Sequence, residues 1–229
     1  MNESVFYLES VDSTNRWAKE HLDRFGPVGA VYTTSQTAGR GRLGRSWVNA
    51  AGQALYYTAV IRVPLAQTAT LPLFASLAVQ DALKQRYNVY CQIKWPNDLL
   101  LNGKKLVGIG INLAQPQAYF DAAALPHGTS LALQGVPVDL NADPEWLAQY
   151  LTDFGFDRAL YTYETEGFAP FRERYKAACV NLGRPVQFDG GAGIARDVDE
   201  QGRLVVECAD GAHRVFTGEV SVRGIYGAV

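Results

Sequence analysis

Residues 39–47 read Gly-Arg-Gly-Arg-Leu-Gly-Arg-Ser-Trp, a stretch with three glycines, three arginines and one tryptophan. Glycine lets a backbone turn with positive φ and come close to a ligand. Arginine carries a permanent charge on a planar fork that fits phosphate, and backbone N–H groups in such a loop add further donors. The stretch therefore predicts an anion-binding loop, with a solvated basic loop as the alternative.

Two β-rich runs flank this loop, so we expect it at the end of a sheet. Residues 30–34 lead through Gln36 into the loop, and residues 54–63 read as a long strand after it. Further upstream, Ser13 and Thr14 carry the side chains of helix N-caps. The same turn offers hydroxyl groups and the positive end of a helix to a ligand, so a capping role and a binding role both stay open.

A second polar segment, Trp-Pro-Asn-Asp at residues 95–98, follows a predicted helix over 70–88 and a predicted strand over 89–94. Proline fixes the backbone after the strand, and Asn97 and Asp98 then project at the sheet end. An aspartate there can hold a hard cation, and an ordinary turn is the alternative. Asn102-Gly103, next along the chain, predicts a two-residue type I′ hairpin turn.

Composition bounds the class of protein. The chain has 229 residues and 25.1 kDa, with 48% hydrophobic residues and a net charge of −2, which fits one main domain and a small second one. A duplex-DNA binder would show a broad basic face, and the charge here is concentrated in the glycine-arginine loop. We expect no signal peptide and no membrane span, and therefore a cytoplasmic protein.

The cysteines indicate buried thiols in a reducing compartment. They are three in number, far apart, and in no Cys-x-x-Cys pair. We expect no zinc site, because the histidines do not cluster with them. The residues concerned are Cys91, Cys179 and Cys208, and His21, His127 and His213.

The second half of the chain changes character near residue 181. Before it, residues 143–163 and 167–178 predict helices, the first with a proline in its first turn. After it, five short β-rich runs are separated mostly by glycine-containing pairs. This spacing predicts a small β-barrel of about fifty residues.

Taken together, these motifs resemble the biotin protein ligase family. The matching segments occur in the family's order over nearly the whole chain: residues 11–15, 36–47, 94–98, 105–112, 183–186 and 218–223. The resemblance implies an α+β fold, with a mixed-sheet catalytic domain packed with helices over residues 1–180 and an SH3-like β-barrel over 181–229. Because the first motif begins near residue 11, we expect a monofunctional ligase without the winged-helix DNA-binding domain.

The resemblance implies a two-step reaction that uses ATP, Mg²⁺ and biotin. Biotin is first converted to biotinyl-5′-AMP, and a lysine of a biotin carboxyl carrier protein then attacks the mixed anhydride. Fixed cations near the reacting phosphorus lower the barrier to such a transfer. The implied catalytic residues are Arg40, Arg42 and Lys105.

The implied binding residues fall into two sets. The biotin set is Ser13, Thr14, Gln36, Gly39, Arg40, Gly41, Arg42, Lys105, Gly108 and Gly110. The nucleotide set is Arg42, Arg45, Trp47, Asn97, Asp98, Asn112 and Arg223, with Asp98 also implied to hold Mg²⁺. Biotin's ureido ring is neutral with two donors and one acceptor, so hydroxyl and amide partners suit it.

Partners and rival functions follow from the same resemblance. It implies a biotin carboxyl carrier protein or domain as acceptor, and neither DNA nor a membrane as a partner; association through the sheet into a homodimer stays open. One rival is a lipoate-type acyl-adenylate ligase or transferase of the same fold. Others are a biotin-binding protein that has lost ligation and, least supported by the acidic composition, a nucleic-acid-binding module.

One departure from the family pattern affects the site. Two motifs that the family separates by a hairpin are fused here into residues 105–112. If that run is extended, Lys105 and Asn112 lie about 23 Å apart and face opposite ways, so they cannot meet at one ligand. We therefore expect residues to be missing between Val107 and Gly110, with consecutive Cα atoms there well beyond about 3.8 Å; a deleted relative is the alternative.

Overall fold

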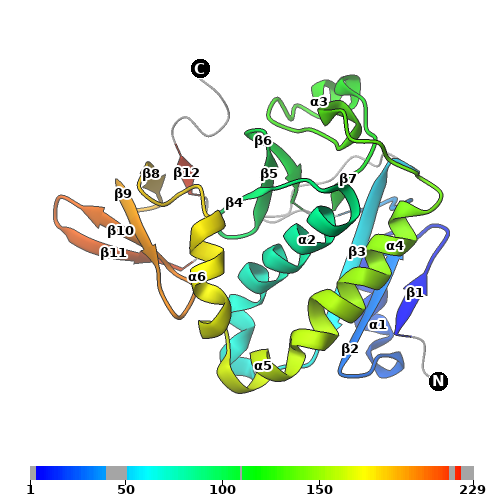
Figure 1. Cartoon of the computed structure of the whole chain (residues 1–229), viewed down its shortest axis with the longest axis horizontal. Coiled ribbons are helices and arrows are strands. Elements are labelled where there is room, and N and C mark those ends of the chain that lie inside the picture. Colours follow the sequence, from blue (N-terminus) through cyan, green and yellow to red (C-terminus); the bar gives the residue numbers. More distant parts are fainter. Residues whose placement is uncertain (1–3, 40–50, 109, 217–219, 223–229) are drawn as a thin grey trace.

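The main sheet has seven strands in the order β1-β2-β3-β7-β6-β5-β4 (Figure 1). The computed structural model describes residues 4–39, 51–108, 110–216 and 220–222. Strands β1 and β2 pair in parallel and the other neighbours pair antiparallel, so the expected mixed sheet is confirmed. The strands are β1 (Val5–Tyr7), β2 (Val28–Thr33), β3 (Ala54–Ile61), β4 (Gln92–Lys94), β5 (Asp98–Leu101), β6 (Lys104–Val107) and β7 (Ile111–Asn112).

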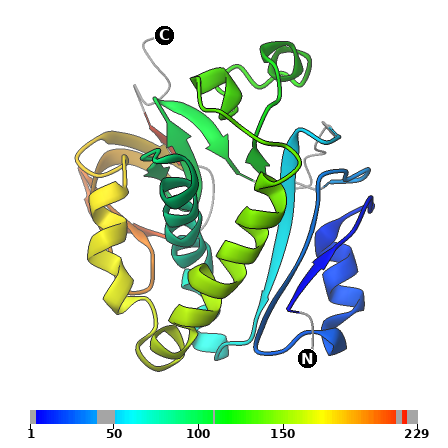
Figure 2. The ribbon, with the colours of Figure 1, turned by 45° about the vertical axis from the view of Figure 1, so that its right-hand side comes forward.

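Helices cover both faces of this sheet. Helix α1 (Thr14–Glu20) packs on β2 and β3 from one side. Helix α2 (Leu71–Tyr87) lies on the other side, next to a continuous helical run of α4 (Asp143–Tyr150), a π-helical segment (Leu151–Asp157) and α5 (Arg158–Glu166). Figure 2 shows β2 and β3 standing between α1 and α4. The segment that leads into the glycine-arginine loop, up to Gly39, therefore leaves a sheet that is packed on both faces.

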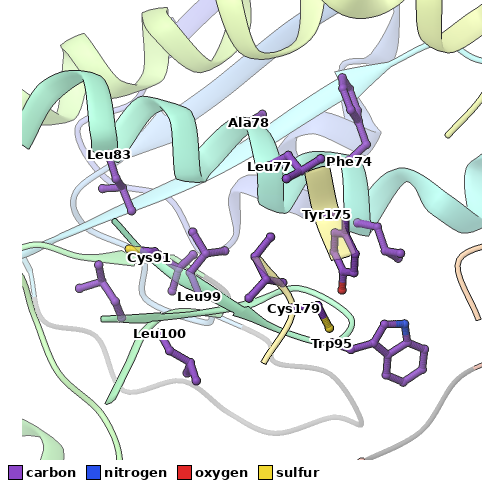
Figure 3. Close-up of a cluster of buried hydrophobic side chains, with 14 of the residues drawn as sticks. Phe74, Leu77, Ala78, Leu83, Cys91, Trp95, Leu99, Leu100, Tyr175 and Cys179 are labelled. Carbon is purple, nitrogen blue, oxygen red and sulfur yellow. The ribbon is translucent and has the colours of Figure 1, made fainter. Parts of the chain in front are cut away.

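The main core forms between α2 and the sheet. Figure 3 shows Leu83 of α2 pointing toward Leu99 and Leu100 of β5, and all three belong to one buried cluster. Leu77, Leu83 and Ile93 are 1% exposed or less. Helices α3 (Gln117–Ala122) and α6 (Ala169–Ala178) and short 3-10 turns at Leu22–Arg24, Leu65–Thr70 and Ala132–Gln134 complete the helical structure described. No helix among the described residues is both long and apolar enough to span a membrane.

Local turn chemistry is confirmed at the hairpin between β5 and β6. Asn102 has φ of 50° and Gly103 has φ of 73°, as a type I′ turn requires. Asn88, at the end of α2, has φ of 54° and its N–H donates to the carbonyl of Lys84. Both positions follow from the tolerance of asparagine and glycine for the left-handed region.

The C-terminal strands form a second, antiparallel sheet in the order β11-β10-β9-β8-β12. They are β8 (Pro185–Phe188), β9 (Gly191–Val198), β10 (Leu204–Cys208), β11 (Gly211–Val215) and β12 (Ser221–Val222). In the described part of the chain this sheet is open, with β11 and β12 at its edges, so the expected closed barrel is not confirmed. Cys208 and His213 lie close together across the β10–β11 turn, and the expectation that no histidine clusters with a cysteine was wrong.

The run from Lys105 to Asn112 is not extended, so the separation of about 23 Å that an extended run would give does not apply. Strand β6 pairs antiparallel with β7, with Val107 opposite Ile111, and the N–H of Gly108 donates to the carbonyl of Gly110 at 3.4 Å. The chain thus reverses direction between Val107 and Ile111. Gly108 and Gly110 are closely packed there, since a Cβ would come within 2.6 Å of Lys105 at the first and 2.8 Å of Leu55 at the second. The break that we expected falls on Ile109, which lies outside the described residues.

The core between α2 and the neighbouring helices gives a direct stability test. Phe74 is 4% exposed and its ring contacts Phe156, Tyr163 and Phe171. Phe74→Ala should lower the free energy of unfolding by roughly 3–5 kcal/mol in urea titrations, since it removes an aromatic ring and leaves a cavity. Phe154→Ala, at a side chain that is 55% exposed, should cost less than about 1 kcal/mol. Equal losses would refute this core.

Candidate active site

Thr14, Gln36 and Thr58 form a polar cluster between α1 and the sheet. The N–H and hydroxyl of Thr14 both donate to Oε1 of Gln36, at 2.9 and 3.1 Å. The hydroxyl of Thr58, on β3, donates to that of Thr14 at 2.9 Å. Thr14 and Gln36 are 4% and 5% exposed. Buried polar groups are stable when they are hydrogen-bonded, so this cluster holds two of the predicted biotin-binding residues in fixed positions.

Ser13 caps helix α1, which confirms the capping role that the sequence predicted as one of two roles for this residue. Its hydroxyl accepts from the N–H of Arg16 at 3.4 Å. The chain that leads into the glycine-arginine loop runs past this cap, because the N–H of Ala38 donates to the carbonyl of Asp12 at 2.8 Å. Gly39, the next residue, is buried. The loop therefore begins beside Ser13 and Thr14.

Lys105 on β6 and Asp98 at the start of β5 form an ion pair. The Nζ of Lys105 lies 2.8 Å from Oδ2 of Asp98, and both side chains are half-buried. The backbone of Gly108 lies beneath them: a Cβ there would come within 2.6 Å of Cε and 3.0 Å of Nζ of Lys105. The sequence assigned separate roles to the lysine and the aspartate, and the structure pairs them.

Contacts from the C-terminal half of the chain hold the segment that carries Asp98. The backbone N–H of Trp95 donates to Oδ1 of Asn181 at 2.8 Å, and its indole Nε1 donates to the carbonyl of Gly202 at 2.9 Å. The hydroxyl of Tyr175 donates to the carbonyl of Pro96 at 2.8 Å. Burial raises the pKa of the Tyr175 phenol well above its usual value, and the carboxylate of Asp98 raises it further, so this group remains a donor.

Asn112 belongs to a buried polar network rather than to an open surface. It is 4% exposed; its Nδ2 donates to the carbonyl of Thr129 at 3.0 Å, and its Oδ1 accepts from Nε2 of Gln115 at 2.9 Å. Asn112 thus holds the segment after β7 against the sheet. The nucleotide contact that the resemblance implies for it stays a prediction.

The Thr14 cluster and Asn112 share one face of the sheet. Asn112 pairs with Ala54 of β3, and paired residues project to the same side. Along β3, every second residue returns to that side, which puts Ala54 and Thr58 together. Gly110 packs closely against the backbone of β3, since a Cβ there would lie 2.8 Å from the carbonyl oxygen of Leu55. The face that packs on α1 is therefore the face of the candidate site.

Comparison with known proteins identifies the family. Residues 7–121 match the model of the Biotin/lipoate A/B protein ligase family, and residues 182–223 match that of the Biotin protein ligase C terminal domain. This chain belongs to the biotin/lipoate A/B protein ligase family. The resemblance inferred from the motifs is confirmed.

Relatives within the family align over most of their lengths. A biotin--[acetyl-CoA-carboxylase] ligase of Paracoccus denitrificans is 33% identical over 95% of this chain and 100% of its own. The bifunctional ligase/repressor BirA of Escherichia coli is 29% identical over 96% of this chain and 74% of its own. The biotin protein ligase of Aquifex aeolicus, solved in complex with biotin and ATP, superposes with a TM-score of 0.76 at 26% identity, over 96% and 98% of the two chains.

Several predicted site residues fall outside the described part of this family member: Arg40, Gly41, Arg42, Arg45, Trp47 and Arg223. Asn97 lies in the turn between β4 and β5, next to Asp98. The structure adds Thr58, Tyr175 and Asn181, which sequence reasoning missed. Each forms its hydrogen bond with a residue far away in the sequence, and none belongs to a local sequence motif.

The Thr14 cluster gives a second stability test. Thr14→Val keeps the branched shape but removes the hydroxyl that bonds Gln36 and Thr58. We expect a loss of about 1–2 kcal/mol in the free energy of unfolding, because buried polar partners lose a hydrogen bond. Thr165→Val, at an exposed helix position, is the matched control and should change stability by less than about 0.5 kcal/mol. Indistinguishable losses in the two variants would contradict the cluster.

Proposed function

We propose that this chain attaches biotin to a lysine of a biotin carboxyl carrier protein in an ATP-dependent reaction through biotinyl-5′-AMP. The observation that carries the proposal is the Lys105–Asp98 ion pair in the same sheet as the Thr14 cluster, within a chain of this family. The relative from Paracoccus denitrificans is named a biotin ligase, and the relative from Aquifex aeolicus binds biotin and ATP.

In the first step, a carboxylate oxygen of biotin attacks the α-phosphorus of ATP. The new P–O bond forms as the bond to the β-phosphate oxygen breaks, and pyrophosphate leaves with its electron pair. Negative charge gathers on the α-phosphate oxygens in the transition state, where a fixed cation stabilises it most. Lys105 supplies that cation, and Asp98 holds its ammonium in place before the substrates arrive.

The Thr14 cluster suits the neutral head of biotin. The hydroxyl of Thr14 and the amide of Gln36 are hydrogen-bonded to each other, and they can exchange these bonds for the donors and acceptor of a ureido ring. Ser13 and Gly39 lie next to them along the chain. A Cβ on Gly108 or Gly110 would clash with neighbouring protein atoms. We propose that these two residues contact biotin through their backbone atoms alone.

The arginines of the glycine-arginine loop complete the anion site in this proposal. Arg40 and Arg42 would act with Lys105 on the carboxylate and α-phosphate. The nucleotide residues outside the described part, Arg45, Trp47 and Arg223, and the described Asn97 would bind the remainder of ATP. The loop leaves the sheet beside Ser13, which is the side where Thr58 and Asn112 project.

A magnesium ion fits this site only together with ATP. Asp98 already has a lysine ammonium on Oδ2, and Mg²⁺ is typically held by one or two carboxylates plus substrate phosphates. When bound, Mg²⁺ would neutralise phosphate charge. Asp98 is the carboxylate placed to hold it, with the ammonium of Lys105 kept beside it on Oδ2.

In the second step, the amine of a carrier lysine attacks the carbonyl carbon of biotinyl-5′-AMP, and AMP leaves with the bonding electrons as an amide forms. We propose residues 1–180 as the catalytic domain and residues 181–229 as an SH3-like domain. The contacts of Asn181 and Gly202 to Trp95 support a role for the second domain in holding the Asp98 segment. We also propose that the chain works in a reducing compartment and that its acceptor is a carrier protein. The same proposal includes association of two chains through the sheet.

Biotin-dependent release of pyrophosphate tests the proposed function. Purified chain with ATP and Mg²⁺ should release pyrophosphate when biotin is added, and radiolabelled biotin should then pass to a carrier domain. Lipoate in place of biotin is the discriminating control, because the family also contains lipoate ligases by name. Activity with lipoate alone would establish the rival acyl-adenylate ligase, and biotin binding without pyrophosphate release would establish a binding protein.

The role of Lys105 has a matched control in its neighbour. Lys105→Met should lower the rate of biotin-dependent pyrophosphate release by about 10²- to 10³-fold, since it removes a fixed charge from the transition state. Lys104→Met removes an exposed lysine one residue away and should leave the rate unchanged. Equal rates in the two variants would remove Lys105 from the reaction.

A further inference from the structure

Three metal-ligating side chains meet on the hairpin of β10 and β11. The Sγ of Cys208, a carboxylate oxygen of Asp210 and a ring nitrogen of His213 all lie within 4.8 Å of one another. Nε2 of His213 is 2.9 Å from Oδ1 of Asp210. Residues spaced as Cys-x-Asp-x-x-His on a tight hairpin are thus gathered at one point.

The strand register explains why they meet. Cys208 pairs with Gly211, and Val206 pairs with His213, so Cys208 and His213 are diagonal neighbours on the same face of the hairpin. Gly211 has no side chain to stand between them. Its φ of 125° is open to glycine alone, and it lets the chain turn directly after Asp210.

A second glycine clears the space beneath the thiol. A Cβ on Gly193 of β9 would lie 2.9 Å from Sγ of Cys208, so any other residue would push the thiol away. On the far side, the ring of His213 packs near that of Phe188, with centroids 5.8 Å apart. The cysteine and the histidine are therefore positioned from both sides, and Asp210 is the exposed third member.

We propose that Cys208, Asp210 and His213 bind a thiophilic divalent metal ion, with zinc as the best match. A four-coordinate zinc ion with bonds of about 2.0–2.3 Å holds its donor atoms roughly 3.3–3.8 Å apart, which small side-chain rotations reach here. Thiolate and imidazole ligands favour zinc over magnesium or calcium. Water would fill the fourth position.

This site is separate from the proposed ligase site. The β10–β11 hairpin lies at one edge of the C-terminal sheet, and Figure 1 shows it at the far left, away from β6 and β7. Bound metal would tie the two strands across their turn and stabilise the hairpin. The proposal therefore stands or falls independently of the ligase reaction.

Cobalt(II) serves as the probe, since it gives an absorption signature when bound by thiolate. Chelator-treated, reduced full-length chain should bind one equivalent, with a sulfur-to-cobalt charge-transfer band and the visible bands of a four-coordinate ion. Added zinc should bleach both. Asp210→Asn and His213→Gln should weaken cobalt binding by at least about tenfold. Zinc should raise the Tm of the wild-type chain but not that of Cys208→Ser.

The cysteine variants decide the assignment. Cys208→Ser should abolish the charge-transfer band, while Cys91→Ala, which removes a buried cysteine elsewhere, should keep it. Circular dichroism confirms that each variant is folded. The proposal is overturned if the wild-type chain shows no thiolate band, or if Cys208→Ser keeps it with the same affinity.

Discussion

The ion pair between Lys105 and Asp98 is the contact on which the candidate active site depends. Both groups are half-buried, and the opposite charge of the aspartate holds the lysine ammonium in one place. The type I′ turn at Asn102-Gly103 aligns Leu100 with Lys105, and the register of β5 against β6 then shifts between Leu99 and Leu100, just before Asp98 is reached. Gly108 then leaves room for the lysine side chain to reach the carboxylate.

The C-terminal part of the chain contributes to this pair from a distance. Its residues Asn181 and Gly202 accept hydrogen bonds from Trp95, three residues before Asp98. Trp95 is 3% exposed, so its N–H groups need partners inside the protein. The C-terminal part of the chain therefore helps to position the segment that carries Asp98.

Local chemistry was predictable from sequence, and long-range contacts were not. The Asn102-Gly103 turn, the cap at Ser13 and the helix over 71–87 each follow from a few neighbouring residues and were expected. Thr58 was missed because its partner Thr14 lies 44 residues away. Family motifs brought Thr14, Gln36, Asp98 and Lys105 forward, yet they gave no sign that the lysine and the aspartate pair with each other.

Two features were missed because strands were considered as isolated runs. Residues 105–112 form one apolar run in the sequence, but Val107 and Ile111 pair across a reversal of the chain. Cys208 and His213 look unrelated, but antiparallel pairing makes them diagonal neighbours. In both cases strand pairing, which a single run of sequence does not show, determines which side chains meet.

A double-mutant cycle on Asp98 and Lys105 tests most directly whether the ion pair organises the reaction. The rate of biotin-dependent pyrophosphate release would be measured for Asp98→Asn, Lys105→Met and the double variant. If Asp98 acts by holding Lys105, the double variant should lose no more than Lys105→Met alone. Losses that add to within about 0.5 kcal/mol would show that Asp98 acts through another partner, such as Mg²⁺, and would contradict the claim that Asp98 acts by holding Lys105.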